Sequence, residues 1–435
     1  MKQQMIPLPY GKDSIELSLQ QHHVLEVLKP DKKKHKNSLL SENEIVRKAL
    51  ENPFGSPRLK KMLKPEETVC IIISDITRAW QRMHVFLPVL IRELSDSGIP
   101  DHQITFICAT GSHRNITDEE AKILLGEELF HRFKFYNHDC HDADNLKYLG
   151  TTSFGTKVLV NRMALAHDHL IITGGIVFHD LAGWGGGKKS ILPGICGYDT
   201  IMSNHSLSLG DQPGDGIHEC VRCGTIEGNR LNEDMEEAAE MVNPSFMLNV
   251  IVNSEGRIGS AVTGNYQLAF EEGKKLLDQT DRISIDVLAD MAVVSAGGYP
   301  KDINLYQSTK ALSSAKEAVK KGKVILLLCQ CPEGVGHPEV KNLLEAFDTH
   351  MEREGEMRRA FTVSKFAGFL VSQIAEDYQV YCVTELEPVL LEKLGINVYQ
   401  NVEDALEAIT KEHGKNLNTY VIPSGSNVLP SLTGL

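Results

Sequence analysis

The chain has 435 residues and a net charge of −13, because 58 Asp and Glu outnumber 45 Lys and Arg. Apolar residues make up 42% of the chain and charged residues 24%, which excludes a largely disordered chain and a collagen-like repeat. The acidic balance argues against a protein that neutralises nucleic-acid phosphates, and the length predicts about two or three domains.

Six short runs of β-branched and apolar residues are predicted strands, each followed by a polar or glycine-rich loop: residues 68–73, 104–108, 170–173, 293–295, 324–329 and 380–383. Runs that are apolar throughout are typical of strands buried on both faces of a mainly parallel sheet. Alternating runs around a turn at residues 253–256 predict a β-hairpin over residues 246–264.

Helices are predicted between these strands, where apolar residues recur at helical spacing: residues 79–94, 118–133, 304–321 and 343–359. Thr117, with Glu120 three residues later, forms a capping box at the start of the second helix. Alternation of strand, polar loop and helix predicts an α/β fold whose ligands bind at the carboxyl ends of the strands.

The charge-rich stretch at residues 271–282 is the predicted domain boundary. We expect an N-terminal cofactor-binding domain over residues 1–275 and a C-terminal substrate-capping domain over residues 283–412. Each would have a mainly parallel sheet flanked by helices, with the active site in the interdomain cleft. The C-terminal tail, residues 415–435, is expected to complete the first domain.

Two of the predicted loops carry groups suited to acid/base chemistry or anion binding. Asp75, Ile76, Thr77 and Arg78 place a carboxylate, a hydroxyl and a guanidinium in one turn. Their alternative interpretation is a helix N-cap with an ordinary surface arginine. His113 follows a strand in a tight glycine turn, where an imidazole suits proton transfer at neutral pH, although a lone loop histidine is more often structural.

A glycine-dense segment over residues 173–190 is the most informative part of the chain. A phosphate-binding P-loop needs Gly-Lys followed by Ser or Thr, whereas Lys189 follows Lys188 here and Pro193 interrupts the expected helix. His179, the lysine pair and His205 instead suggest a cofactor held covalently or electrostatically, with a possible metal ligand.

The chain resembles the nickel-dependent lactate racemase family in five motifs that occur in order: SDITR (74–78), ATGSHR (109–114), His179 with AGWGGGKKSILPG (182–194), NHS (204–206) and GGYPKDINLYQSTKA (297–311). In that family, nickel is carried by pyridinium-3,5-bisthiocarboxylic acid mononucleotide, the nickel-pincer nucleotide, which is tethered to a lysine. The resemblance implies a racemase or epimerase that inverts C2 of lactate or a related 2-hydroxy acid. Hydride transfer to the cofactor would pass through a 2-keto acid.

Residue roles follow from the same resemblance. It implies that Lys189 is the tethering lysine, that His205 is the nickel ligand, and that His113 and His179 are the acid/base pair. The family usually has arginine where this chain has Lys188. This change keeps the positive charge but loses the paired N–H donors of a guanidinium, which bind a carboxylate or phosphate through two hydrogen bonds.

Further residues are implied to contact the bound groups. The segment Asp75, Ile76, Thr77 and Arg78 is similar to the one that contacts cofactor, and substrate contacts are implied for Arg78, Tyr306, Gln307 and Lys310. Gln307 and Lys310 lie three residues apart on a predicted helix, so they share one face and could both bind the same carboxylate. The resemblance also implies accessory maturation enzymes as partners.

Two other functions stay open from the residues. A zinc-dependent hydrolase could use His113, His179 and His205 as ligands, but it would need a carboxylate base near the metal. A non-catalytic nickel-binding protein is the second, and Cys220 and Cys223 form the one CxxC pair of the sequence.

Three features of the sequence predict the cellular location. The N-terminus has no continuous apolar stretch after its first lysine, so we expect no signal peptide. No apolar run approaches the roughly 20 residues of a membrane span. The nine cysteines are scattered and several lie in apolar runs, which is typical of a reduced protein. We therefore expect a cytoplasmic enzyme without nucleic-acid or membrane partners.

Overall fold

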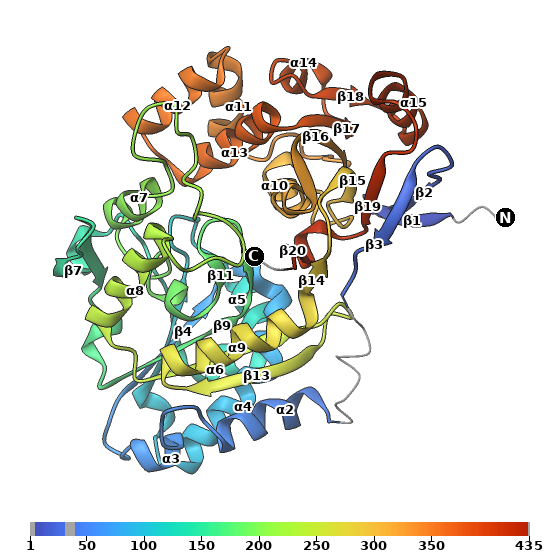
Figure 1. Ribbon diagram of the computed structural model, residues 1–435. Coiled ribbons are helices and arrows are strands. Elements are labelled where there is room, and N and C mark those ends of the chain that lie inside the picture. Colours follow the sequence, from blue (N-terminus) through green and yellow to red (C-terminus); the bar gives the residue numbers. More distant parts are fainter. Residues whose placement is uncertain (1–4, 31–39, 434–435) are drawn as a thin grey trace.

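The structure is a computed structural model that describes residues 5–30 and 40–433. Figure 1 shows two lobes, each built on a six-stranded sheet with helices packed against it. The first lobe comprises residues 40–281, and the second comprises residues 5–27 and 286–428. The predicted α/β class with mainly parallel sheets is confirmed.

The sheet of the first lobe is parallel except for one edge hairpin. Its strand order is β13 (Ile258–Gly264), β12 (Phe246–Val252), β9 (His169–Gly175), β4 (Val69–Ser74), β5 (Ile104–Ala109) and β6 (Lys134–Asn137). The predicted hairpin is confirmed, since β12 and β13 pair antiparallel. Short hairpins outside the sheet are formed by β7 (Leu146–Thr151) with β8 (Lys157–Asn161) and by β10 (Val177–His179) with β11 (Gly183–Gly185).

Both faces of this sheet are buried, because alternate residues of each strand pack into different apolar cores. Ile71 and Ile73 of β4 face one core, which is covered by α2 (Glu42–Glu51), α3 (Leu59–Met62), α4 (Met83–Asp96), α5 (Asp118–Leu125) and α6 (Glu127–Arg132). Cys70 and Ile72 face the other core, under α7 (Tyr198–Ser206), α8 (Arg230–Val242) and α9 (Tyr266–Asp281). The continuously apolar strand sequences reflect this double burial.

The sheet of the second lobe is parallel throughout. Its order is β18 (Asn397–Tyr399), β17 (Gln379–Val383), β16 (Val319–Leu328), β15 (Ala289–Ser295), β19 (Asn418–Ile422) and β3 (His23–Val27). One face packs with α10 (Leu305–Ala315), α11 (Pro338–Ala346) and α13 (Val363–Asp377). The other packs with α15 (Val402–His413) and with the hairpin of β1 (Ile6–Tyr10) and β2 (Asp13–Leu17). The helices α12 (His350–Arg359) and α14 (Pro388–Glu392) complete this lobe.

Two predictions about the chain ends are wrong. The tail 415–435 was predicted to complete the first domain, but β19 (Asn418–Ile422) pairs with β15 and β3 in the second sheet. The N-terminal strand β3, predicted to belong to the first domain, lies beside β19, and Figure 1 shows the blue and red segments together. Between the lobes, β14 (Arg282–Ile285) pairs with β20 (Leu429–Leu432). The pairing of β3 with β19 joins segments about 400 residues apart and leaves no local signal in the sequence.

The six predicted strands are present, but several predicted helices are interrupted. Arg82 takes a left-handed conformation that separates α4 from the turn before it, and Gly126, with φ of 80°, separates α5 from α6. The expected capping box at Thr117 is confirmed. The helix predicted over residues 304–321 ends at Ala315, because residues from Val319 onward pair with β15 as part of β16.

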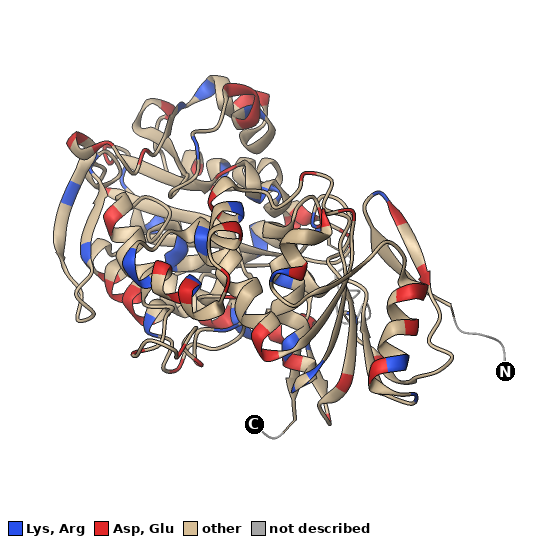
Figure 2. Cartoon of the chain, turned by 90° about the horizontal axis from the view of Figure 1, so that it is seen from above, with Lys and Arg blue, Asp and Glu red and all other residues tan. Residues whose placement is uncertain are grey.

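Charged residues are distributed over both lobes. Figure 2 shows Lys and Arg interspersed with Asp and Glu, mainly on helices and loops. In the part of the chain that the structure describes, no helix is long and apolar enough to span a bilayer.

Candidate functional site

Three loops at the carboxyl ends of neighbouring strands carry predicted site residues. Asp75 follows β4, His113 lies in the loop after β5, and His179 ends β10, which comes directly after β9. Because β4 lies between β5 and β9, the three loops emerge side by side at one edge of the first sheet.

His113 is held by the carboxylate of Asp75. The His113 Nδ1 atom lies 2.7 Å from Asp75 Oδ2, and Asp75 Oδ1 accepts a hydrogen bond from the Thr77 backbone N–H at 2.8 Å. Burial acts to raise the pKa of Asp75, but the hydrogen bonds from His113 and Thr77 lower it overall, so the carboxylate is charged at neutral pH. With Nδ1 engaged, Nε2 of His113 is left for proton transfer.

His179 has partners that suit both of its protonation states. Its Nδ1 accepts hydrogen bonds from the backbone N–H groups of Leu181 at 3.1 Å and Ala182 at 3.3 Å, contacts that suit the neutral ring. The same nitrogen lies 3.1 Å from Asp180 Oδ1, a contact that suits the protonated ring. With Nδ1 as acceptor, the neutral ring carries its proton on Nε2, whereas a proton on Nδ1 beside Asp180 leaves a lone pair on Nε2 when the ring is neutral.

Positive charges converge on His179 from both lobes. Burial lowers the pKa of His179 well below its ordinary value, and the charges of Lys189, Arg78 and Lys310 lower it further, as does neighbouring His205. The imidazole is therefore neutral at pH 7. Because Lys310 lies on α10, its influence on His179 places that helix of the second lobe against the same site.

The glycine-rich turn after β11 is shaped by close packing. Gly186 and Gly187 have φ of 89° and 53°, in the region that favours glycine. A Cβ atom on Gly186 would lie 2.7 Å from Asn249 Oδ1, and one on Gly187 would lie 2.8 Å from the Phe270 ring. Asn249 Oδ1 also accepts a hydrogen bond from the Gly187 N–H at 2.7 Å. The buried Asn249 thus fixes the turn that leads into the lysine pair.

The two lysines of the 3₁₀ turn η5 (Gly187–Ser190) have different surroundings. Lys188 is buried, and its Nζ lies 2.9 Å from Glu236 Oε2. Burial, together with the charge of Arg78, lowers the pKa of Lys189 to about 7. Within residues 5–30 and 40–433, no carboxylate forms an ion pair with Lys189. A substantial fraction of this amine is therefore unprotonated at neutral pH.

His205 presents one free ring nitrogen in a buried position. Its Nδ1 donates to the Ile201 carbonyl oxygen, one helical turn earlier, at 3.0 Å, which leaves the lone pair on Nε2. Burial and the charge of Lys189 lower the pKa of His205 to about 3, so the ring is neutral. A neutral, oriented imidazole is a suitable transition-metal ligand.

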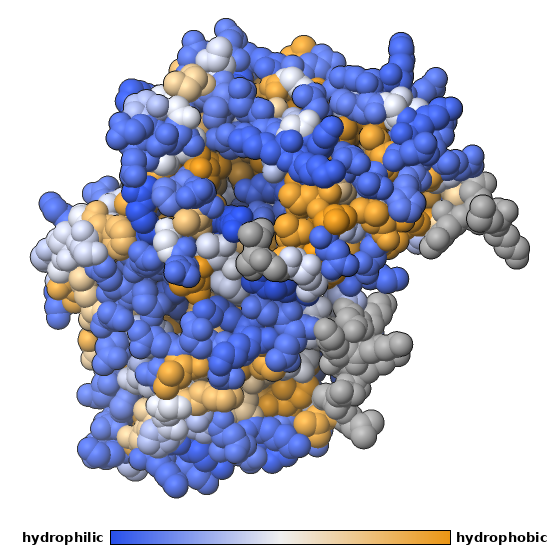
Figure 3. Space-filling view, in the orientation of Figure 1, coloured by the Kyte–Doolittle hydropathy of each residue, from blue (hydrophilic) through white to orange (hydrophobic). Residues whose placement is uncertain are grey.

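The second lobe contributes the first turns of α10. Asn304 caps this helix by accepting a hydrogen bond from the Gln307 N–H at 3.0 Å. Lys310 Nζ donates to Gln307 Oε1 at 3.1 Å, so the two side chains share one face. Surrounding protein and the charge of Arg78 lower the pKa of Lys310 to about 8, although its side chain is open to solvent. Figure 3 shows the surface hollowed between the two lobes.

Of the remaining predicted residues, Arg78 and Tyr306 lie at the site, and Ile76 lies in the core. Arg78 donates to Thr77 Oγ1 at 3.1 Å and acts electrostatically on Tyr306 of α10, so these residues lie with the site. Burial raises the pKa of Tyr306, and its ring packs against the apolar core. The Ile76 side chain packs into the core beside α4.

Within the described residues, the histidines and cysteines form no cluster that suits a metal held by protein groups alone. Among the described residues, no three or more His, Cys, Asp and Glu side chains gather in a way that could bind a metal ion. The three histidines of the zinc hypothesis are all described, so the arrangement counts against it. The thiols of Cys220 and Cys223 likewise lack a third ligand within the part of the chain that the structure describes.

Several residues that support the site were not predicted from the sequence. No role was predicted for Asn249 or Asp180, and Asp75 was predicted to contact the cofactor, with no link to His113. A polar asparagine inside the otherwise apolar strand β12 is the one local signal for Asn249. Glu236 carries no such signal, because it lies among other acidic residues on the amphipathic helix α8.

Comparisons with known proteins show which proteins this chain is similar to. Sequence models of the lactate racemase N-terminal and C-terminal domains match residues 10–216 and 285–429. The lactate racemase of Lactiplantibacillus plantarum is 30% identical over 98% of this chain and 99% of that protein. The lactate racemase of Thermoanaerobacterium thermosaccharolyticum is 34% identical over 76% of this chain and 75% of that protein. The apoprotein structure of a lactate racemase from the same organism matches with a TM-score of 0.89 and 28% identity, over 98% of this chain and 100% of that chain.

Proposed function

This chain belongs to the lactate racemase family and is an isomerase, and we propose that it inverts C2 of a small 2-hydroxy acid such as lactate. The observation that carries the proposal is the pairing of two supported imidazoles at one edge of the first sheet. His113 has a carboxylate partner, and His179 has partners for both of its protonation states.

Inversion at C2 needs one group to remove a proton and another to return it. We propose that the Nε2 atoms of His113 and His179 exchange the proton of the substrate hydroxyl, one acting as base while the other acts as acid. His179 acts as base in the tautomer whose Nδ1–H faces Asp180, because only then does Nε2 carry a lone pair. Asp75 holds the ring of His113 in the orientation for this transfer. The reverse reaction exchanges the two roles, so each imidazole needs support in both states.

The substrate carboxylate would be held by the positive side chains that converge on the site. Arg78 from the first lobe and Lys310 from the second act on the same imidazole, so an anion beside His179 would lie within reach of both. Gln307, bonded to Lys310, could donate its amide N–H groups to a second carboxylate oxygen. Closing the second lobe on the first would then exclude water from the reacting carbon.

The residues present fit a nickel-pincer nucleotide tethered to Lys189. Lys189 offers a half-buried amine with no ion-pair partner within the described chain, and His205 offers a neutral ring with a free Nε2. Because protein side chains alone form no metal site among the described residues, the nickel would arrive with ligands of its own. When bound, this cofactor supplies an acceptor for the hydride of C2. The accessory maturation enzymes of the family would be the partners that build it.

The test uses protein produced together with those maturation enzymes. We expect a nickel-containing protein with a covalent mass addition on the peptide that contains Lys189. Chiral chromatography should show the conversion of one enantiomer of a 2-hydroxy acid into the other, with lactate first in a panel of such acids. Fully matured, nickel-loaded protein that leaves every acid of the panel unchanged would overturn the proposal.

A further inference from the structure

We propose that Glu236 selects which lysine of the pair can be modified, by holding the Lys188 ammonium in a pocket between η5, α8 and α9. Lys189 is then the one amine of the pair left free to accept a cofactor. Glu236 acts here as a positioning residue, since its ion-pair partner is Lys188 and not one of the proposed substrate contacts. The inference rests on the proposed tethering of the cofactor to this segment.

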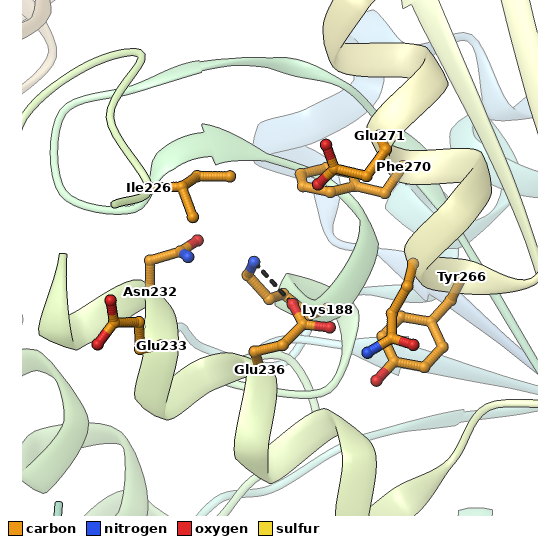
Figure 4. Close-up of a pocket in the computed structure, with 9 residues that line it drawn as sticks. Lys188, Ile226, Asn232, Glu233, Glu236, Tyr266, Phe270 and Glu271 are labelled. Atoms are coloured by element: carbon orange, nitrogen blue, oxygen red, sulfur yellow. Dashed lines mark ion pairs between the residues drawn. The ribbon is translucent and has the colours of Figure 1, made fainter. Parts of the chain in front are cut away.

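The pocket of Lys188 has a volume of about 270 Å³ and lies on the side of η5 that faces α8 and α9 (Figure 4). Lys188 Nζ is 2.9 Å from Glu236 Oε2, and 4% of the Lys188 side chain is exposed. The same ammonium lies 5.3 Å from the centroid of the Phe270 ring, within the range of a cation–π contact. Lys188 is therefore held by both an ion pair and a ring.

The other charged groups around Lys188 do not form this contact. Glu233 lines the pocket one turn before Glu236, and Glu271 lines it from α9. Burial lowers the pKa of Lys188, whereas Glu236 raises it; Lys274 and Glu271 have smaller effects, which lower and raise it respectively. Glu271 is itself paired with Lys274 at 2.7 Å. Glu236 is thus the carboxylate that contacts the Lys188 ammonium directly.

Lys189 leaves the same turn toward a different environment. Its neighbours are Arg78, His179 and His205, which are cationic or neutral at pH 7. Asp180 acts on Lys189 in the opposite sense from Arg78, but it forms no ion pair with that amine in the described part of the chain. Successive residues of a tight helical turn project in different directions, so one lysine faces the pocket while the next faces the site.

The different surroundings of Lys188 and Lys189 affect their reactivity, because an amine must be unprotonated to be joined to a thiocarboxylic acid. That condensation forms a C–N bond, breaks the C–O bond of the thiocarboxyl group, releases one water and leaves a thioamide. An ammonium paired with a carboxylate cannot act as the nucleophile. Without the Glu236 carboxylate, the buried Lys188 ammonium would lose its counter-charge, and the neutral amine would be favoured.

The experiment labels the apoprotein at pH 7 with a small amount of acetic anhydride and locates the acetyl groups by peptide mass spectrometry. In the unchanged protein, we expect at least about tenfold more acetylation of Lys189 than of Lys188. In Glu236→Gln, acetylation of Lys188 should rise about tenfold or more. Glu233→Gln, which changes a carboxylate of the same pocket that does not contact Lys188, should keep the original pattern.

Equal labelling of the two lysines in the unchanged protein would overturn the inference, and this result does not depend on any variant folding. Unchanged labelling of Lys188 in a folded Glu236→Gln protein, checked by its thermal melting curve, would also overturn it. In protein matured with its accessory enzymes, Glu236→Gln should place part of the covalent mass on Lys188. If no mass is added to either lysine of the unchanged protein, the proposed function fails, whereas the labelling contrast can still hold.

Discussion

The two lobes support their candidate site residues in different ways. In the first lobe, buried polar partners fix each group: Asp75 holds His113, and Asn249 holds the turn before the lysines. In the second lobe, Gln307 and Lys310 are bonded to each other near the start of a capped helix and are open to solvent. Groups whose geometry decides the chemistry need rigid support, whereas exposed groups can adapt to different substrates. The first lobe is therefore expected to determine the reaction, and the second to determine affinity.

The largest effect is expected from Lys189→Ala. Removing the amine should abolish the covalent mass addition and all racemase activity, because Lys188, the other amine of η5, is paired with Glu236. Intact-protein mass spectrometry after maturation measures the first effect, and chiral chromatography measures the second. Lys188→Met is the matched control and should keep the mass addition. A mass addition that moves to Lys188 in Lys189→Ala would contradict this prediction and the inference about Glu236.

His113→Gln and His179→Gln test the acid/base pair. Each should lower kcat by about 10²–10⁴-fold, the usual contribution of a positioned general acid or base. Both variants should still carry the covalent mass addition, since neither side chain anchors the cofactor. Steady-state kinetics of matured protein measures the effect. If either variant stayed within a few-fold of the unchanged kcat, the two-histidine scheme would be wrong.

Lys310→Met should have a smaller effect, concentrated in KM. Losing a charged hydrogen bond to the substrate carboxylate costs about 1.5–3 kcal/mol, or about 10–100-fold in kcat/KM. Lys316→Met, just beyond the other end of α10, removes the same charge away from the site and is the control. A loss confined to kcat, with KM unchanged, would give the second lobe a role in chemistry and would break the contrast between the lobes.

The smallest effect concerns the pH dependence of Lys189 reactivity. With a pKa of about 7, this amine is mostly protonated at pH 6 and mostly neutral at pH 8, so its acetylation rate should rise about tenfold over that interval and then level off. A lysine with an ordinary pKa would instead rise by about 100-fold over the same interval and continue rising. Labelling of the apoprotein over pH 6–9 distinguishes the two. The steeper profile would mean that this part of the first lobe does not desolvate the amine.

Local sequence patterns predicted much of the fold. The core strands β4, β5 and β9 were recognisable because double burial makes them apolar at every position, and the hairpin β12–β13 because its residues alternate around a turn. Helix ends were less accurate. The backbone turns left-handed at Arg82, a residue type with no particular preference for that conformation.

Residues with distinctive chemistry were predicted more completely than the residues that support them. His113, His179 and Lys189 stand out because two imidazoles and a lysine follow strands in glycine-rich loops, and His205 stands out through the NHS motif, although it lies in α7. Asn249 and Glu236 do not stand out, since an amide or a carboxylate in a regular element has many ordinary uses. Their roles depend on a segment distant in the sequence, which only packing brings into contact.

By itself, the sequence determined the α/β class, the loops that carry chemistry and the resemblance to one family, because these depend on local periodicity and on residue type. Tertiary structure decided the pairing of the first and last strands of the second sheet and the different surroundings of Lys188 and Lys189. Both depend on contacts between distant segments. Strand pairing and side-chain direction are set by how the whole chain packs, and neighbouring residues in the sequence do not encode them.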